Sequence, residues 1–329
     1  MASKYPNGFK HGVSIRGVPL IQTHPGQVFW VSNSSVVPVN GATGSDSNDG
    51  TFDRPFATLA QAISSTTAGR GDVIFMKPGH AESVTAAAGI VLSKAGVAII
   101  GLGVGAQRPT ITFTTANTAS ITVTANDVSI QNVLFVGGFL NVATCFSIAN
   151  AQVATDFTVD MCEFRDSSTV LNFVKIINVG TTANIADGLT FTRNKIFGKA
   201  SSPAAGTTAV VTASDTARVT ISDNIIVHDV LLNDTPILFE GGALNHTGFI
   251  VSGNNCFRAS TSCASSGHLI GSSSTACTGH VFDNYVKTLD VAAMLIAPTG
   301  TKLGFTNNLL SGTADTSGIL IPAADSDGS

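Results

Sequence analysis

The chain has 329 residues, of which 43% are hydrophobic and only 12% are charged, and its formal net charge is −4. This balance, with Lys and Arg scattered along the chain, argues against a nucleic-acid-binding surface. No uninterrupted apolar stretch reaches the ~18 residues that suggest a transmembrane helix, and the first residues lack the apolar core of a secretion signal. We therefore expect no nucleic-acid partner, no membrane span and no Sec-dependent export.

Residues 1–43 differ in composition from the rest of the chain. They are rich in proline and contain the only tryptophan, Trp30. This segment is predicted to be an N-terminal arm or cap with one strand around Phe29 and Trp30. These two aromatic residues are the candidates for packing of this segment against other protein chains.

A short helix and a strand are predicted directly after the arm. A turn-rich loop at 44–50 precedes apolar residues spaced i, i+3, i+4 and i+7, a helical pattern, at Phe56, Leu59, Ala60 and Ile63. Residues 73–76 are apolar and precede a Pro-Gly pair, which predicts a strand that ends in a turn.

From here to about residue 312 one pattern returns about every 30 residues. It is apolar, any, apolar, any, any, Asn, any, apolar, and its clearest copies begin at Leu189, Val219 and Phe249. The alternation predicts a strand with one buried face, and a repeat of this length indicates a solenoid. The sequence thus predicts an arm (1–43), a solenoid (44–312) and a C-terminal tail (313–329).

The asparagine of each repeat is predicted to point into the solenoid. A buried amide is costly unless it is hydrogen-bonded, and strands stacked about 4.8 Å apart would let successive amides bond to one another. We therefore predict a structural asparagine ladder of Asn194, Asn224, Asn254, Asn284 and Asn308.

The outward positions of the repeat hold few candidates for catalysis. Asp223 and Asp283 share one column, two coils and about 9.6 Å apart by the strand spacing, close to the separation of some glycosidase carboxylates. Asp-Asn is also a common bend dipeptide, and Arg193 is expected to neutralise Asp223. The bend interpretation is preferred, so no catalytic residue and no enzymatic activity is predicted, with this pair as the alternative.

Two further features of the outward positions weigh against a glycan enzyme. Glu163 and Lys195 fall on adjacent coils and are expected to form an exposed ion pair of small energetic value. The chain has one Trp, two Tyr and 19 Phe, and most of the Phe fall on inward positions of the repeat. Few aromatic rings are therefore expected to be available as sugar platforms.

No cofactor or metal is predicted. The odd number of cysteines suggests no disulfide framework, and Cys162 and Cys256 fall on inward positions. A zinc site would need residues whose spacing fits no common zinc pattern, namely Cys256, Cys263, Cys277, His268 and His280. The glycines at 101, 103 and 105 imitate a dinucleotide fingerprint, but a strand rather than a helix follows them, so they are interpreted as a turn between coils.

Residues 44–63 (GSDSNDGTFDRPFATLAQAI) and 71–79 (GDVIFMKPG) resemble the opening of right-handed parallel β-helix proteins of the pectin-lyase-like type. In that family a short helix caps the barrel, and the asparagine repeat extends the resemblance to about residue 312. The resemblance implies an all-β, right-handed parallel β-helix solenoid with a capping helix. This fold serves lyases, hydrolases, adhesins and virion proteins, so it does not specify a function.

The arm carries a narrower resemblance. Residues 5–19 (YPNGFKHGVSIRGVP) and 24–31 (HPGQVFWV) are similar to the starts of virion proteins of tailed bacteriophages, among them trimeric capsid decoration (cement) proteins. The resemblance implies a homotrimer that contacts the major capsid protein on the outer capsid surface of a virion. We therefore predict a capsid decoration protein, with a tail-associated spike that binds or cleaves host polysaccharide as the alternative.

Overall fold

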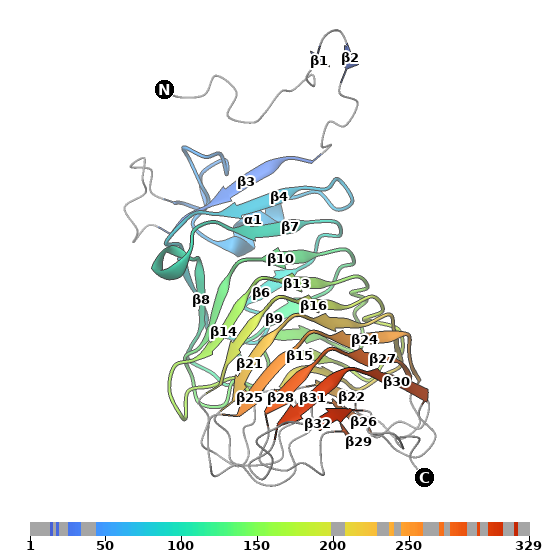
Figure 1. Cartoon of the computed structure of the whole chain (residues 1–329). Coiled ribbons are helices and arrows are strands. Elements are labelled where there is room, and N and C mark those ends of the chain that lie inside the picture. The colour runs from blue at the N-terminus through green and yellow to red at the C-terminus, as the bar shows by residue number, and fades with distance from the viewer. Residues whose placement is uncertain are drawn as a thin grey trace.

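The computed structural model describes residues 14–15, 18–19, 26–33, 44–198, 208–228, 237–239, 245–258, 270–272, 277–287, 295–296, 302–311 and 319–321. Within these ranges the chain winds into a solenoid whose strands stack in three columns (Figure 1). The predicted fold class, an all-β right-handed parallel β-helix, is confirmed.

Each column of strands is one β-sheet, and from β4 to β18 each strand belongs to a different sheet from the strand before it. Sheet 1 contains β3 (Val28–Val31), β4 (Val73–Met76), β7 (Ala98–Gly101), β10 (Ser129–Gln131), β13 (Thr158–Asp160), β16 (Thr190–Thr192), β20 (Thr220–Ser222), β24 (Phe249–Ser252), β27 (Thr278–Phe282) and β30 (Lys302–Thr306). Sheet 2 contains β5 (Ala81–Val84), β8 (Thr110–Phe113), β11 (Leu134–Gly137), β14 (Glu163–Asp166), β17 (Lys195–Phe197), β21 (Ile225–His228), β25 (Asn255–Arg258), β28 (Tyr285–Lys287), β31 (Asn308–Ser311) and β32 (Ile319–Ile321). Sheet 3 contains β6 (Ile90–Leu92), β9 (Ile121–Val123), β12 (Phe146–Ile148), β15 (Lys175–Val179), β18 (Thr208–Thr212), β22 (Ile237–Phe239), β26 (Ile270–Ser272) and β29 (Leu295–Ile296).

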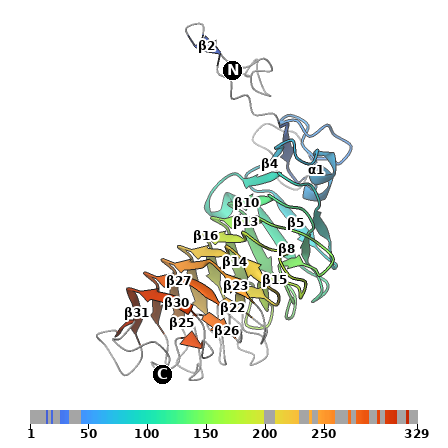
Figure 2. The same ribbon diagram turned by 90° about the vertical axis from the view of Figure 1, so that its right-hand side faces the viewer.

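The strands of successive coils stack stepwise along the solenoid (Figure 2), and they are paired in register. In sheet 1, Thr190 pairs with Thr220 and Thr220 pairs with Ile250 in parallel ladders. The sequence repeat therefore corresponds to one coil. Three shorter pairings differ from this plan: β31 and β32 are antiparallel, β1 (Ser14–Ile15) pairs with β2 (Val18–Pro19), and β19 (Thr216–Ala217) pairs with β23 (His246–Thr247).

A short helix, α1 (Leu59–Ser65), covers the first coils at the N-terminal end of the solenoid. Thr58 caps the helix by accepting a hydrogen bond from the Gln61 amide at 3.2 Å, as N-cap residues commonly do. The buried side of α1 consists of Leu59, Ala62 and Ile63. The Asp46 carboxylate accepts the Ala57 and Thr58 amides at 3.0 and 2.9 Å, so the turn-rich loop is tied to the helix that it precedes.

The strand predicted within the N-terminal arm or cap (1–43) is present as β3. β3 pairs in parallel with β4 and is the first strand of sheet 1, so it belongs to the β-helix. Phe29 points inward, is 8% exposed and stacks on Phe56 with ring centroids 6.1 Å apart. Because alternate residues of a strand face opposite sides, Trp30 points outward, and Phe29 lies in the core instead of on a surface for a partner.

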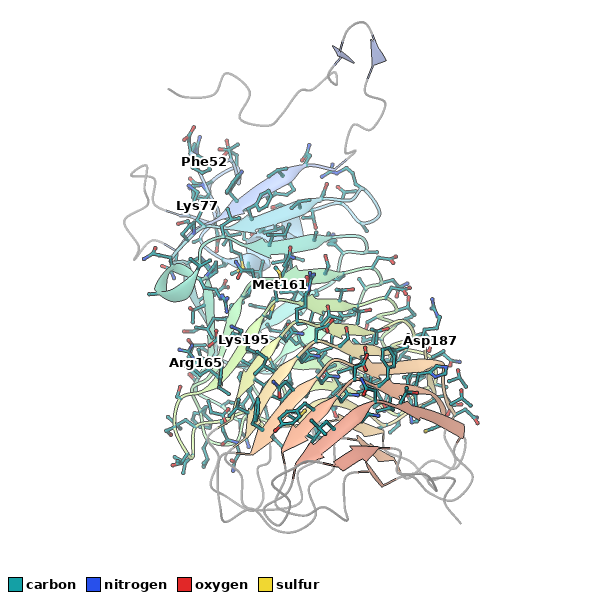
Figure 3. All side chains as sticks on the ribbon, viewed as in Figure 1. Phe52, Lys77, Met161, Arg165, Asp187 and Lys195 are labelled. Atoms are coloured by element: carbon teal, nitrogen blue, oxygen red, sulfur yellow. The ribbon has the colours of Figure 1, made fainter. Side chains whose placement is uncertain are left out.

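Trp30 packs in a small aromatic cluster on the outer side of the cap. Its ring lies 4.9 Å from that of Phe52 and 5.0 Å from that of Phe75. Lys77 places its ammonium 3.9 Å from the centre of the Phe52 ring and donates a hydrogen bond to the Phe52 carbonyl (Figure 3 labels both residues). Burial lowers the pKa of Lys77.

We predict that Trp30→Ala destabilises the cap, because these ring contacts are lost. The expected decrease in the free energy of unfolding is about 1–2 kcal/mol, since the side chain is only half-buried. Trp30→Phe, which keeps a ring between Phe52 and Phe75, should recover most of the loss. Urea unfolding curves of both variants test this, and equal losses for the two would contradict the aromatic role.

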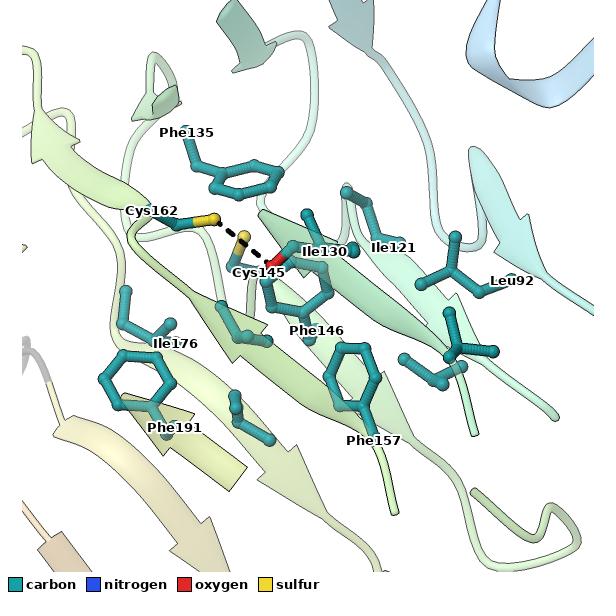
Figure 4. Packing of buried hydrophobic residues seen from close by; sticks show 14 of the residues in the cluster. Leu92, Ile121, Ile130, Phe135, Cys145, Phe146, Phe157, Cys162, Ile176 and Phe191 are labelled. Carbon is teal, nitrogen blue, oxygen red and sulfur yellow. Dashed lines mark hydrogen bonds between the residues drawn. The ribbon is translucent and has the colours of Figure 1, made fainter. Parts of the chain in front are cut away.

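The core lies between the three sheets and is rich in phenylalanine. Phe164 is 1% exposed and stacks on Phe135 at 5.2 Å and on Phe191 at 5.8 Å in the neighbouring coils. Cysteines fill smaller positions, and the Cys162 thiol contacts the Ile130 carbonyl at 3.7 Å (Figure 4). Burial raises the pKa of Cys162 to about 12, so this thiol is protonated and serves as an apolar residue.

The predicted asparagine ladder is present as a continuous chain of hydrogen bonds. Its members are at most 1% exposed: Asn194, Asn224, Asn254, Asn284 and Asn308. The backbone N–H of each of the first four donates a hydrogen bond to the side-chain oxygen of the asparagine on the next coil, at 2.9–3.2 Å. Each side-chain amide also donates to a strand carbonyl, at 2.8–3.0 Å. The buried amides are thereby satisfied at the bend between sheets 1 and 2.

No helix within the described ranges has the length and apolar character needed to cross a bilayer.

Candidate functional site

A surface hollow of about 470 Å³ lies at the bend between sheets 1 and 2 in the N-terminal half of the solenoid. It is lined by residues from β7 to β17 and the bends after them: Ile100, Gly101, Val104, Arg108, Gln131, Asn132, Met161, Cys162, Arg193 and Lys195. Met161 and Lys195 lie on the same side of the solenoid in Figure 3, with Arg165 beside them. Cationic and amide side chains thus gather on one edge of the fold.

Asp160 anchors the sheet 1 side of the hollow. Its carboxylate accepts hydrogen bonds from Gln131 Nε2 at 3.1 Å, Thr192 Oγ1 at 3.1 Å and Arg193 Nε at 2.8 Å, and from a second nitrogen of the Arg193 guanidinium. The hydrogen bonds and charge of Asp160 raise the pKa of Arg193. These four bonds use the acceptor capacity of the carboxylate, so it orients Gln131 and Arg193 at the hollow.

Glu163 anchors the sheet 2 side. Its carboxylate accepts Arg108 Nη1 at 2.9 Å through one oxygen and Arg165 Nε at 3.1 Å through the other. Lys195 is the register partner of Glu163 on the next coil, as predicted from the repeat. The expected Glu163–Lys195 ion pair is replaced, since Glu163 pairs with the two arginines and no ion pair of Lys195 is found within the described residues.

The hollow carries an excess of positive charge. Three cationic side chains line the hollow (Arg108, Arg193 and Lys195), and Arg165 pairs with Glu163 beside it. Three carboxylates oppose these four charges, since Asp160 and Glu163 pair with the arginines and Asp223 interacts with Arg193, in a chain whose overall charge is −4. A cationic concavity on an acidic protein concentrates the field on one small region. The chemistry that fits it is an anionic group that accepts hydrogen bonds from guanidinium and ammonium donors.

The bend itself explains why these side chains reach the surface. Asn132, Met161 and Arg193 occupy the same position of three successive coils and have left-handed backbone φ angles of 56°, 52° and 53°. Gly101 lies under this bend, where a Cβ atom would stand 2.2 Å from the Asn132 carbonyl oxygen. The Asn132 side chain donates to the carbonyls of Gly101 and Gly103 at 2.8 and 3.0 Å, which holds the adjacent loop in place.

The alternative catalytic pair, Asp223 and Asp283, occupies the same bend position farther along the solenoid. Both residues are exposed and have left-handed φ angles of 57° and 54°. Gly253 lies between them in the column, and Asn307 donates to Asp283 at 2.6 Å. The Arg193 guanidinium forms its close ion pair with Asp160, and the charge of Asp223 makes a smaller contribution to the raised pKa of Arg193. Neither aspartate lines the hollow.

The hollow could not be predicted from any single column of the repeat, because its residues come from several columns. Asp160 and Arg193 lie in neighbouring columns on successive coils, so only a diagonal comparison would have paired them. Arg108 comes from a loop outside the repeat, after the short 3-10 helix Gly105–Gln107. This loop is the turn between β7 and β8, as predicted from its glycines.

The zinc alternative receives no support from the described part of the chain, where no cluster of three metal-ligating side chains occurs. Cys263 and His268 lie outside the described residues. Cys256 is 4% exposed in the core, and burial raises its pKa to about 12.

No protein-family model matches the chain, and no curated protein matches it in sequence. Among solved structures, it is similar to a pectin methylesterase mutant in complex with a hexasaccharide, with a TM-score of 0.51 and 12% identity over 85% of this chain and 92% of that one. It is also similar to the pectin methylesterase from Aspergillus niger in deglycosylated form, with a TM-score of 0.49 and 13% identity over 87% of this chain and 90% of that one. A rhamnogalacturonan lyase is similar with a TM-score of 0.36 and 14% identity over 86% of this chain and 87% of that one.

These likenesses confirm the pectin-lyase-like fold and have no bearing on the bacteriophage resemblance. The prediction of no enzymatic activity is corrected at the level of the fold, because the pectin methylesterase that shares this fold at a TM-score of 0.51 is an enzyme by name. At such low identity the likeness shows the fold alone. Function therefore has to be argued from the side chains of this chain.

Proposed function

We propose that the protein is a β-helix that recognises an acidic polysaccharide through the cationic hollow. The observation that carries the proposal is the charge excess of the hollow on a chain with a net charge of −4. The fold of a pectin methylesterase that was solved with a hexasaccharide is a supporting likeness. The proposal corresponds to a spike that binds or cleaves host polysaccharide, which the structural neighbours favour over capsid decoration.

The hollow offers preorganised donors to an anionic sugar. Asp160 and Glu163 hold Arg193 and Arg108 in place, so these guanidinium groups lose little conformational freedom on binding. Lys195 is exposed and supplies a mobile ammonium at the rim. The amide nitrogens of Gln131 and Asn132 are held by bonds within the protein, so their side-chain oxygens are the groups that can accept hydrogen bonds from sugar hydroxyls. A carboxylate, sulfate or phosphate on the sugar supplies the complementary charge.

We predict that Lys195→Met weakens the binding of polygalacturonate about three- to tenfold at low salt, because one cation of the hollow is lost without any change to the core. Affinity electrophoresis with polygalacturonate in the gel measures the retardation of each variant. Raising the salt concentration should reduce the difference between wild type and variant, since the exposed charges are then screened.

Lys94→Met is the matched control, because Lys94 lies at the bend between sheets 3 and 1, away from the hollow. It should migrate as wild type does, and dextran, a neutral polymer, should retard none of the proteins. Equal mobility of wild type in gels with and without polygalacturonate and other acidic polysaccharides would refute the proposal. Assays of the same mixtures for new reducing or unsaturated ends decide whether binding leads to cleavage.

Capsid decoration is a second proposal, and it is supported by the resemblance of residues 5–31 to the starts of phage virion proteins. In this proposal the protein is a homotrimer on the outer surface of a virion, bound to the major capsid protein, and Trp30 is a contact candidate. Co-purification with intact DNA-filled heads at a copy number that matches their three-fold positions would support it. Association with tails alone would contradict it.

A further inference from the structure

An apolar strip continues from the hollow along the outer face of sheet 2. It is formed by side chains that alternate with the buried positions of β17, β21, β25 and β28: Phe197, Ile225, Val227, Phe257 and Tyr285. Ile225 is 37% exposed, and the other four are half-buried. Contiguous apolar side chains that are partly exposed on an outward sheet face offer a surface for a ligand.

The strip begins at the hollow. Lys195, which lines the hollow, is followed in the same column by Ile225, Asn255 and Tyr285 on the next three coils. Three strand spacings separate Lys195 from Tyr285, a distance of about 14 Å along the solenoid axis. One ligand of extended shape can therefore contact the cationic hollow and the apolar strip together.

Two aromatic rings form the far end of the strip. Phe257 and Tyr285 lie on adjacent strands with ring centroids 5.7 Å apart and planes inclined at 62°. Aromatic rings on a rigid sheet offer large contact areas at low entropic cost, and the C–H faces of pyranose rings pack on such surfaces. Asn255 lies beside Tyr285 in the column and provides an amide near the rings.

We infer that the outer face of sheet 2, from Lys195 to Tyr285, is an extended subsite for an acidic oligosaccharide. An anionic sugar occupies the hollow, and the following sugar rings lie on the strip, with Phe257 and Tyr285 as the stacking platform. This inference rests on the proposed function. The charge of the hollow and its continuity with the strip favour a saccharide over a second copy of the chain as the occupant.

The test compares galacturonate oligomers of two lengths. A disaccharide is too short to reach from the hollow to the aromatic pair, whereas a hexasaccharide covers both. We expect Phe257→Leu to weaken hexasaccharide binding about fivefold and to leave disaccharide binding unchanged. Tyr285→Phe, which keeps the ring, should bind the hexasaccharide nearly as wild type does. Isothermal titration calorimetry measures each affinity.

Phe282→Leu is the matched control, since Phe282 is a half-buried outward phenylalanine on sheet 1. It should bind both oligomers as wild type does. If wild type binds both oligomers and Phe257→Leu has no effect on the hexasaccharide, the extended subsite is refuted while the hollow stands. If wild type binds neither oligomer, the proposed function fails as well. A change in oligomeric state of Phe257→Leu, with unchanged hexasaccharide affinity, would assign the strip to contacts between copies and overturn the inference.

Discussion

Asn224→Ala is expected to lower the free energy of unfolding by about 2–5 kcal/mol, because buried polar groups lose their partners. The Asn224 side chain donates to the Phe191 carbonyl at 3.0 Å and to Asn254 at 2.8 Å, and it accepts the Asn194 amide at 2.9 Å. Alanine removes all three bonds at a site with no solvent exposure. Urea denaturation followed by far-UV circular dichroism measures the loss.

Asn178→Ala is the control for this prediction. Asn178 is half-buried on the outer face of β15, where it accepts a hydrogen bond from Lys175 Nζ at 3.1 Å. Its replacement should cost less than about 1 kcal/mol, since solvent can satisfy Lys175. A loss for Asn224→Ala no larger than that for Asn178→Ala would show that the ladder has little part in stability.

Asp72→Asn is expected to destabilise the N-terminal end of the solenoid by about 3 kcal/mol at neutral pH. The Asp72 carboxylate has no solvent exposure and accepts Arg70 Nε, the Thr67 amide and the Gln27 amide, each at 2.7 Å. These bonds join Gln27, which directly precedes β3, to Asp72, which directly precedes β4. An asparagine can accept some of them but cannot balance the guanidinium charge.

The pH dependence of this effect follows from the pKa of Asp72. Burial alone would raise the pKa, but the hydrogen bonds from Arg70, Thr67 and Gln27 outweigh burial and lower it below the ordinary value of 3.8. A carboxyl group with a lowered pKa in the folded state stabilises the protein above its unfolded-state pKa, and this contribution is lost as the pH falls through the folded-state value. The difference between wild type and Asp72→Asn should therefore be largest at neutral pH and should shrink below about pH 4.

Thermal unfolding of both proteins between neutral pH and acid pH checks this dependence. Asp127→Asn serves as the control, because Asp127 is exposed and its left-handed φ angle of 55° also suits asparagine. It should change the unfolding temperature little at any pH. A constant difference between wild type and Asp72→Asn across the pH range would contradict the assigned role of the Asp72 charge.

The solenoid could be predicted because the alternation of apolar residues within each strand matches the burial of that strand between stacked coils. Each inward position of the repeat is set by strand alternation, and each coil buries its neighbour, so one repeat predicts the burial of Phe164, Phe191 and Asn224 together. The helix α1 was predicted by its own periodicity. In the coil of β10 the asparagine is displaced by one residue: Asn132 lies at the left-handed bend position, and Val133 takes the inward position of the ladder column.

The surface properties were harder to predict, because they depend on neighbours that are distant in sequence. Phe257 and Tyr285 form a ring pair across two coils, although phenylalanine was expected mainly in the core. Glu163 was assigned to Lys195 by strand register, but long arginine side chains from a loop and from the same strand reach it first. Register places Cα atoms, while side-chain length and direction decide which charges meet.

The sequence by itself determined the parallel β-helix, its coil length and the asparagines that line its bend, because these follow from periodic burial and from the need to satisfy buried amides. Only the tertiary structure decided where charge and aromatic surface gather. Arg108, Asp160 and Arg193 come from the coils of β7, β13 and β16, and they meet because each stacked strand brings residues about 30 positions apart to within one strand spacing.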